Sequence, residues 1–408
     1  MGAEQPSEPQ APPERGNPLE VLLVATRLGL TSFGGPVAHL GYFRNEYVHR
    51  RRWLGEKTFG DLIALCQLLP GPASSELGIA IGMLRAGLPG GFLAWVGFTL
   101  PSAVALVAFA FATQAFGSAD LRWLHGLQVV AVAVVAQAVW TMSRSLTPDR
   151  LRVGLALAAA VVVLVLPPAW GQVAVIVAGG AAGAFLPRER ETPAELGVRI
   201  PIGRLFGAAS LIALVALLIL LPVASRLSGS QALAGFDAFF RAGSLVFGGG
   251  HVVLPLLQSE VVPTGWVTNQ QFLTGYGAAQ AVPGPLFTFS AYLGTVLHGP
   301  PNGIPGAALA LAGMFLPSFL LVWGALPFWG LLHGRPAFGA ALRGVNAAVV
   351  GLLLAALYTP VFTSAVRGPA DFGLALVDFG LLMVVRLPPW AVVLISGAAG
   401  AGLAALGR

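Results

Sequence analysis

Long apolar stretches, separated by short polar or glycine- and proline-rich segments, run along nearly the whole chain. A helix needs about 20 mainly apolar residues to cross the hydrocarbon core of a membrane. The stretches predict spanning helices at residues 18–42, 59–84, 89–116, 123–143, 151–167, 171–187, 204–222, 233–258, 270–297, 304–330, 340–362, 370–387 and 389–406. The expected fold is therefore an all-α polytopic integral membrane protein with about 12 to 13 transmembrane helices, several of them broken.

The two halves of the chain repeat the same order of features. Phe-Gly-Gly at residues 33–35 returns after 214 positions, and Pro-Gly-Pro at 70–72 returns after 213 positions. Such self-similarity indicates an internal duplication. The domains are assigned as a disordered tail (1–18), a first repeat (19–187), a linker with an extra helix (188–230) and a second repeat (231–408). Because equivalent helices lie an odd number of spans apart, the repeats are expected to be inverted in the membrane.

Composition supports the membrane assignment and narrows the function. With 56% hydrophobic residues, 10% charged residues and a mean hydropathy of +0.79, the chain has too little polar surface to cover a soluble globule. The net charge of +6 is typical of loops beside lipid headgroups, so a lipid bilayer and not nucleic acid is the expected partner. A single cysteine and the absence of nucleotide-binding or metalloprotease motifs predict no disulfide, metal, cofactor or enzymatic activity.

Glycine and proline interrupt the apolar helices at corresponding places in both repeats. A membrane tolerates the backbone groups of a broken helix only where they line a cavity or are buried in protein. After the first Pro-Gly-Pro, a new helix start would present the N–H groups of Ala73, Ser74 and Ser75, and helix starts attract anions. Residues 283–290 offer the same arrangement. The Pro-Gly-Pro segments are predicted to bind a substrate anion, with a packing kink as the alternative.

Two arginines lie at matching positions inside apolar runs, six residues before each Phe-Gly-Gly motif. They are Arg27 and Arg241. A charge at that depth costs at least about 2.5 kcal/mol and is a functional candidate by default. Asp237 could neutralise Arg241 from one helical turn away, whereas Leu23 stands at the equivalent position before Arg27. Arg27 is therefore the better predicted anion ligand, with a headgroup or loop anchor as the alternative.

Proton coupling has its own candidates. Glu46 and Glu260 are the acidic residues matched in both repeats, and inside the protein they could bind and release a proton. At the membrane surface they would be ordinary solvated charges. His39 is a further candidate, although His251 stands at a different spacing from its glutamate, which favours packing roles for both histidines. Gln67 and Gln280 precede the Pro-Gly-Pro motifs by three positions and could donate to an oxyanion or cap a broken helix.

These motifs carry a resemblance to a known family. FGGPVAHLGYFRNEYV and DLIALCQLLPGPASS, followed by a second FGG and PGP copy, resemble the chromate ion transporter family in its two-domain form, from about Leu19 onward. The resemblance implies a carrier of the bacterial inner membrane that expels chromate, depends on the proton motive force and meets sulfate as a look-alike anion. Family motif positions fall on Gly34, Gly35, Pro36, His39, Glu46, Gln67, Pro70, Gly71 and Pro72, and on Gly248, Gly249, Gly250, Glu260, Gln280, Pro283, Gly284 and Pro285.

One position departs from the family pattern. The family often has Gln where Glu76 follows the first Pro-Gly-Pro. A carboxylate there repels an anion unless it is protonated, so Glu76 either turns away or joins the proton-coupling candidates. A carrier of sulfate or another oxyanion is the alternative function, and a passive anion channel or an intramembrane enzyme is a more distant one. Coupling stoichiometry, membrane orientation and assembly into a homo-oligomer are left open.

Overall fold

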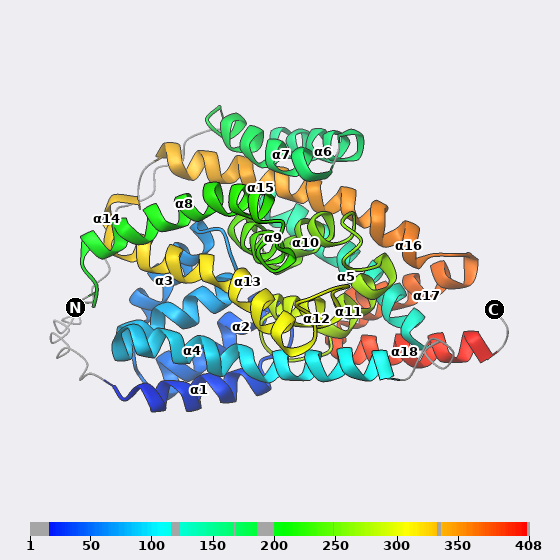
Figure 1. The fold of residues 1–408 in the computed structure, drawn as a ribbon, viewed down its shortest axis with the longest axis horizontal. Coiled ribbons are helices and arrows are strands. Elements are labelled where there is room, and N and C mark those ends of the chain that lie inside the picture. The colour runs from blue at the N-terminus through cyan, green and yellow to red at the C-terminus, as the bar shows by residue number, and fades with distance from the viewer. Residues whose placement is uncertain are drawn as a thin grey trace, which may run out of the picture.

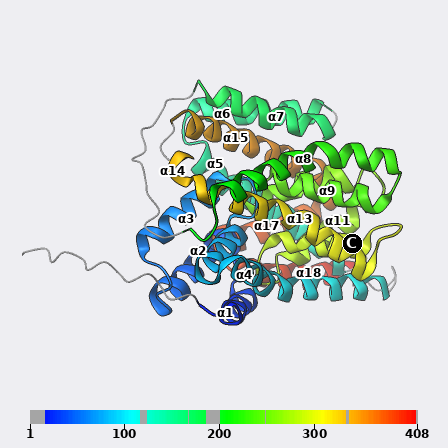
Figure 2. The ribbon, with the colours of Figure 1, turned by 60° about the vertical axis from the view of Figure 1, so that its left-hand side comes forward.

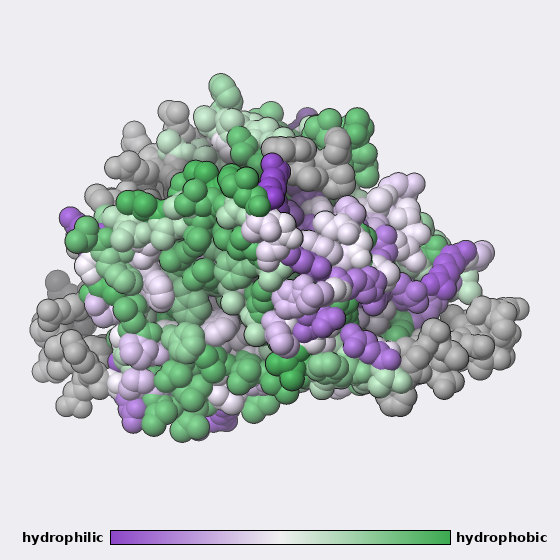
Figure 3. All heavy atoms as spheres, viewed as in Figure 1, coloured by the Kyte–Doolittle hydropathy of each residue, from purple (hydrophilic) through white to green (hydrophobic). Residues whose placement is uncertain are grey.

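The computed structural model describes residues 16–115, 123–166, 168–185, 200–247, 249–332 and 336–405. These residues form helices, turns and loops, with no strand among them. Within this part of the chain, the helices long and apolar enough to cross a membrane are Ala73–Ala115, Leu124–Leu146, Arg204–Ser228, Gly303–Phe328 and Gly339–Ala365. Apolar side chains cover much of the face in Figure 3, and hydrophilic ones gather over the end near α11 and α16. The chain is an all-α multi-pass membrane protein, as its apolar stretches predicted.

The helices follow one another in two matching series (Figure 1). The first series is α1 (Pro18–Thr31), α2 (Gly35–Phe43), the π-helix η1 (Arg44–Arg50), α3 (Glu56–Leu68), α4 (Ala73–Ala115), α5 (Trp123–Leu146), α6 (Arg150–Val165) and α7 (Pro168–Gly183). The second is α9 (Gln231–Leu245), η2 (Gly250–Val252), α10 (Val253–Val261), α11 (Asn269–Ala279), η3 (Leu286–Thr288), α12 (Phe289–Val296), α13 (Gly303–Ala325), η4 (Leu326–Phe328), α14 (Trp329–Leu332), α15 (Pro336–Ala356), η5 (Leu357–Phe362), α16 (Thr363–Ala365), α17 (Pro369–Gly380), η6 (Leu381–Val385) and α18 (Pro389–Ala405). Between them lies α8 (Arg204–Ser228), the predicted extra helix.

The repeated glycine and proline motifs break the helices where expected. Phe-Gly-Gly separates α1 from α2, and Pro-Gly-Pro separates α3 from α4 and α11 from η3. Gly34, Gly71 and Gly284 have φ of 99°, 144° and 91°, a region that residues with a Cβ atom rarely adopt. Helix α4 is itself interrupted by non-helical backbone at Ala86 and Gly87, between two predicted spans. Predicted spans such as 18–42 and 270–297 therefore consist of two shorter helices each.

Two backbone hydrogen bonds join the repeats reciprocally. The N–H of Gly71 donates to the carbonyl of Val246 at 2.7 Å, and the N–H of Gly284 donates to the carbonyl of Ser32 at 2.9 Å. Each bond links one repeat's Pro-Gly-Pro to the residue preceding the other repeat's Phe-Gly-Gly. An exchange of equivalent contacts is the mark of a two-fold relation. The two repeats are thus related by a local pseudo-two-fold axis at their breaks.

Several helix pairs away from the breaks follow the same relation. Helix α1 packs along α4 as α9 packs along α13. Farther along the chain the repeats exchange partners, because α5 packs against α17 and α18 of the second repeat while α15 packs against α6 and α7 of the first (Figures 1 and 2). Gly126 on α5 meets the backbone of Ser396, and Gly344 on α15 meets that of Gly179. These glycines align α5 with α15 at an offset of 218 residues.

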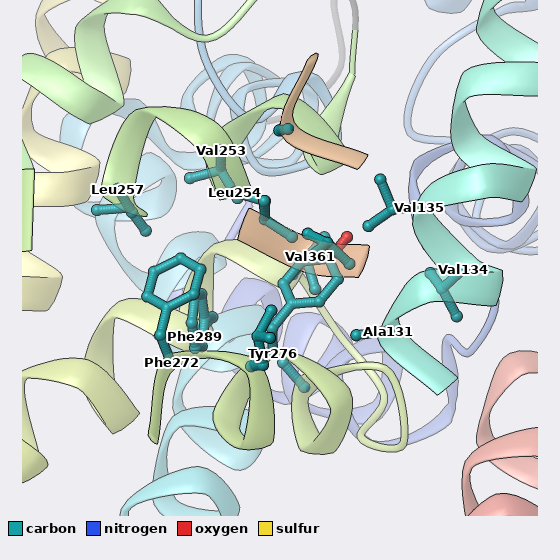
Figure 4. Close-up of a cluster of buried hydrophobic side chains, with 14 of the residues drawn as sticks. Ala131, Val134, Val135, Val253, Leu254, Leu257, Phe272, Tyr276, Phe289 and Val361 are labelled. Atoms are coloured by element: carbon teal, nitrogen blue, oxygen red, sulfur yellow. The ribbon is translucent and has the colours of Figure 1, made fainter. Parts of the chain in front are cut away.

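The pseudo-symmetry is not complete. Helix α8 lies against α9 and α13 and covers the second repeat. We call residues 34–72 the α2–α3 unit and residues 249–285 the α10–α11 unit, each running from one break to the next. The α10–α11 unit packs against the helices α5, α7 and α15, and Figure 4 shows its residue Tyr276 toward Ala131 of α5, with Phe272 farther from α5 and next to Phe289. The α2–α3 unit packs mainly against α4 and, among the described residues, has no comparable contact with α15.

Candidate substrate site

A cavity of about 840 Å³ lies between the two repeats. Both Phe-Gly-Gly breaks and both Pro-Gly-Pro breaks contribute to its wall, together with α3, α5 and single residues of α15 and the α18 start. The predicted substrate residues that line it are Gly34, Gly35, Pro36, Gln67, Gly71, Ala73, Ser74, Gly249, Gln280 and Gly284. Breaks that lie far apart in the sequence therefore meet at one place.

Four helical segments begin at this cavity. Their first residues, Gly35 of α2, Ala73 of α4, Gly250 of η2 and Leu286 of η3, all belong to its wall. The segment η2 continues into α10, and η3 continues into α12. The first N–H groups of a helix have no acceptor within it, and the peptide dipoles leave partial positive charge at that end. The cavity thus has the electrostatic character of an anion site.

The lining side chains are uncharged. Among the described residues of the wall, none is Lys, Arg, Asp or Glu. Three polar residues of α5, Gln137, Thr141 and Ser145, recur every four positions along one side, and Asn346 of α15 adds an amide. Sequence reasoning missed these residues, although polar side chains at helical spacing in an apolar run were a usable signal. An anion here would be bound by neutral donors and helix starts.

Two second-repeat residues place polar atoms at the wall. The amide nitrogen of Gln280 is buried and meets the geometry of no hydrogen bond, with the Tyr276 hydroxyl beside it. Leaving a buried donor unpaired costs about 1 to 3 kcal/mol, which an oxyanion accepting from it would recover. His251 also lines the cavity, with its Nδ1 atom 2.9 Å from the Tyr276 hydroxyl. The N–H groups of the Pro-Gly-Pro glycines are already engaged between the repeats, so these glycines join the two halves and do not donate to a ligand.

The structure does not bring Arg27 to the cavity. Helix α1 buries Val21, Val24 and Leu28 on its inner face, and the helical period turns Arg27 to the exposed face, beside Leu23. Its predicted role as an anion ligand therefore has no support from its position, and the anchor alternative fits the geometry better. The matching position in sequence did not reveal which face of the helix looks inward.

Arg241 is engaged with carboxylates. Its Nη1 and Nη2 atoms donate to the two carboxylate oxygens of Glu260 at 2.8 Å each, and its Nε atom donates to Asp237 at 3.1 Å. The predicted neutralisation by Asp237 is present, and Glu260 is a second partner that sequence spacing did not suggest. Neither Arg241 nor Glu260 belongs to the cavity wall.

Glu46 occupies the equivalent position in the first repeat and has different partners. Arg51 and Arg50 donate to its carboxylate at 2.8 and 3.1 Å, and Arg51 also bonds Glu20. Burial acts to raise the pKa of Glu46, but the hydrogen bonds and charges of the two arginines outweigh it and hold the pKa below its usual range. Glu46 thus belongs to an ion network at η1, between α2 and α3, and is not part of the cavity wall.

Glu76 and His39 lie directly behind the cavity wall. Glu76 is fully buried in the first turn of α4, neither of its carboxyl oxygens meets the geometry of a hydrogen bond, and the carboxyl contacts Gly71, with the Ser318 hydroxyl facing it. The Nδ1 atom of His39 lies 3.2 Å from the hydroxyl of the wall residue Ser74. Both side chains are therefore one contact away from a bound ligand.

The remaining predicted residues flank the site or fall outside it. Ser75 and the four prolines of the Pro-Gly-Pro motifs shape the breaks without lining the cavity. Gly248 lies outside the described residues.

A membrane protein with two related repeats, whose broken helices surround one cavity, has the architecture of an internally duplicated secondary transporter. A family model described as chromate transporter matches residues 19–184 and 233–401. The chain belongs to this chromate transporter family.

Individual relatives agree with the family match over most of the chain. A chromate transport protein of Pseudomonas aeruginosa is 30% identical, covering 92% of this chain and 89% of that protein. A chromate transport protein of Cupriavidus metallidurans is 29% identical over 95% of this chain and 92% of its own length. A probable chromate transport protein of Synechococcus elongatus is 28% identical over 81% of each chain. No solved structure matches the chain.

Proposed function

We propose that this protein is a secondary active transporter that exports chromate across a bacterial inner membrane. The observation that carries the proposal is the single cavity on which both Phe-Gly-Gly and both Pro-Gly-Pro breaks converge. Its helix starts suit a negative ligand, and its amides and hydroxyls can donate to several oxygens of a tetrahedral ion at once. The names of the relatives at 28 to 30% identity support chromate as that ion.

Sulfate is the competing substrate because it has the same charge and nearly the same shape as chromate. The neutral cavity wall provides no cationic clamp that would favour one of them. Specificity between the two must therefore come from small differences in fit to the amide and hydroxyl donors.

Transport by the purified protein in liposomes tests the function. We expect saturable chromate flux that sulfate inhibits competitively and that requires an intact cavity. A variant with Gln280→Leu and Asn346→Leu removes two wall amides and should raise KM for chromate at least about tenfold. Linear, unsaturable current with voltage would indicate a channel, and chemical conversion of chromate without flux would indicate an enzyme.

Glu76 is the proposed proton-coupling residue. An ionised Glu76 behind the wall would repel a dianion, so the anion is carried with Glu76 protonated. A dianion that moves with one proton carries one net negative charge. The interior-negative membrane potential then drives this singly charged complex outward. The electrical driving force is about 2.3 kcal/mol per 100 mV for each net charge. The electrical part of the proton motive force would thereby drive export.

Reversal potentials test this coupling. With no pH gradient and a tenfold gradient of dianionic chromate, net flux through the wild-type protein should be zero at a membrane potential of about 59 mV, the value for one net charge. Glu76→Gln cannot carry the proton, so its reversal potential should be about 30 mV, the value for two charges. Glu56→Gln, a half-exposed partner of Arg44, is the matched control and should behave as wild type. Equal reversal potentials in the wild type and Glu76→Gln would remove Glu76 from the coupling.

A further inference from the structure

The α10–α11 unit is fastened to α5 by a polar contact inside the packed interface. The Nε2 atom of Gln128 on α5 donates to the hydroxyl of Thr274 on α11 at 3.1 Å, and both side chains are buried. Nearby, Gly277 of α11 lies directly on the backbone carbonyl of Leu127, where a larger residue would not fit. This side of the molecule is therefore closed by direct contact between the two helices.

The same two positions exist on the other side of the pseudo-two-fold axis. The offset of 218 that aligns α5 with α15 places Asn346 at the position of Gln128. The offset of 213 that aligns α3 with α11 places Asp61 at the position of Thr274. A side-chain amide thus stands opposite a hydrogen-bonding side chain in both pairs, although the residue types differ.

On this second side the corresponding pair, Asp61 and Asn346, is not in contact through a hydrogen bond in the part of the chain that the structure describes. The Oδ2 atom of Asp61 and the Oδ1 atom of Asn346 are both buried without a hydrogen-bond partner. The cavity lies here, since its wall includes Asn346 of α15 and the α3 residues Cys66 and Gln67.

We propose that Asp61 and Asn346 form the second gate of the transporter, a reading that rests on the proposed carrier function. In the alternate state α3 closes on α15, and the Asp61 carboxylate accepts a hydrogen bond from the Asn346 amide. At the same time α11 leaves α5, and the bond between Gln128 and Thr274 breaks. The cavity then opens on the opposite side of the pseudo-two-fold axis, so the substrate has access from one side at a time.

The energetic argument follows from the symmetry. Each state makes one amide contact and leaves the other pair unpaired, so the hydrogen bonds of the two gates offset each other. A small free-energy difference between two states is what a carrier needs, because both must be populated during one cycle. The buried Oδ2 atom of Asp61 has no partner in this state and gains one on closure, when it accepts from the Asn346 amide nitrogen.

Cysteine cross-linking tests the gate whatever the transported ion is, because disulfide formation reports which helices are in contact. Oxidation of Asp61→Cys with Asn346→Cys should form a disulfide in the membrane and stop flux, and reduction should restore it. Gln128→Cys with Thr274→Cys should do the same from the closed side, and the two cross-links should exclude each other when all four cysteines are present. The buried Cys66 is present in every variant, and the single cysteine variants are the controls for any bond to it.

The outcomes separate the gate from the transport function. Failure of the Asp61→Cys/Asn346→Cys pair to cross-link, or full flux in the cross-linked protein, would overturn the gate. Mutually exclusive cross-links in a protein that moves no chromate would keep the gate and overturn the substrate.

A substitution series gives a second measurement. Asp61→Ala should slow flux about tenfold, since it removes one charge-assisted hydrogen bond from one state only. Asp61→Asn keeps an oxygen that can accept from the Asn346 amide, so it should retain clearly more flux than Asp61→Ala. Loss of flux in Asp61→Asn equal to that of Asp61→Ala, at normal membrane insertion, would contradict the pairing.

Discussion

The α2–α3 unit and the α10–α11 unit descend from one repeated sequence but sit differently on the helices around them. Thr274 and Gly277 of α11 contact α5 directly, whereas α3 makes no comparable contact with α15 in the part of the chain that the structure describes. The first unit therefore lacks the contact with α15 that would correspond to the contact of its twin with α5. Both units have the same backbone breaks, so the breaks do not explain the difference. Access to the cavity is therefore set by which unit packs against its neighbouring helix.

The charged residues differ between the repeats in the same way. Arg241 holds Glu260 by two hydrogen bonds, while Arg27 points outward and Glu46 is held by Arg50 and Arg51. The sequence had paired these positions as equivalents. Equivalent positions can thus hold their charges with different partners when their units are docked differently.

The helices that follow the two Pro-Gly-Pro breaks show a third contrast. Glu76 of α4 is replaced at the equivalent position by Phe289 of α12, which packs edge-on against Phe272 at 5.1 Å between ring centroids. Only the first break therefore has a titratable group behind it at this position. Proton coupling, on our proposal, belongs to one repeat and not to the pair.

The largest effect is expected from the two arginines. Arg241→Ala leaves Asp237 and Glu260 without their cation and should lower the free energy of unfolding by about 3 kcal/mol, the low end for a buried pair because the Arg241 side chain is 33% exposed. Arg27→Ala removes an exposed side chain and should change it by less than about 0.5 kcal/mol, with flux retained. Thermal unfolding in detergent measures both. Equal losses would mean that the two arginines have similar surroundings after all.

A smaller effect is expected from added methyl groups on the two units. Gly277→Ala forces α11 away from the Leu127 carbonyl and should destabilise the docked unit by about 2 kcal/mol. Gly60→Ala, the same change on α3, meets open space and should stabilise the helix by about 0.5 to 1 kcal/mol. Protease susceptibility of each unit reports the difference. Destabilisation by both changes would show that α3 is packed as closely as α11.

The smallest effect concerns acid stability. Because the pKa of Glu46 is lowered in the folded protein, its stabilising contribution is present above the unfolded pKa and is lost as the pH falls through the folded value. Glu46→Gln should therefore cost below about 1 kcal/mol near neutral pH and nothing well below about pH 4. Unfolding midpoints measured across this range would show the two curves converging. A constant difference at all pH values would contradict the ion network.

Several features were predicted from the sequence because they depend on local chemistry. Apolar length identified the membrane fold, and the repeated glycines and prolines located breaks that only such residues allow. A cavity at the breaks was expected too, since exposed backbone groups inside a membrane must line a cavity or be buried in protein. The polar residues of α5 and Asn346 were missed because isolated amides and hydroxyls form no recognisable motif. Their role becomes visible only when the structure places them at the cavity wall.

The sequence by itself determined the class of protein, the duplication and the positions at which the chain must bend, because each follows from hydrophobicity and backbone freedom along a few consecutive residues. Only the tertiary structure decided that Arg27 faces outward, that Arg241 holds Glu260 and that α11 packs against α5 without an equivalent contact between α3 and α15 among the described residues. Those outcomes depend on contacts between segments about 200 residues apart in the chain, and the free energy of such contacts is not encoded in any local pattern.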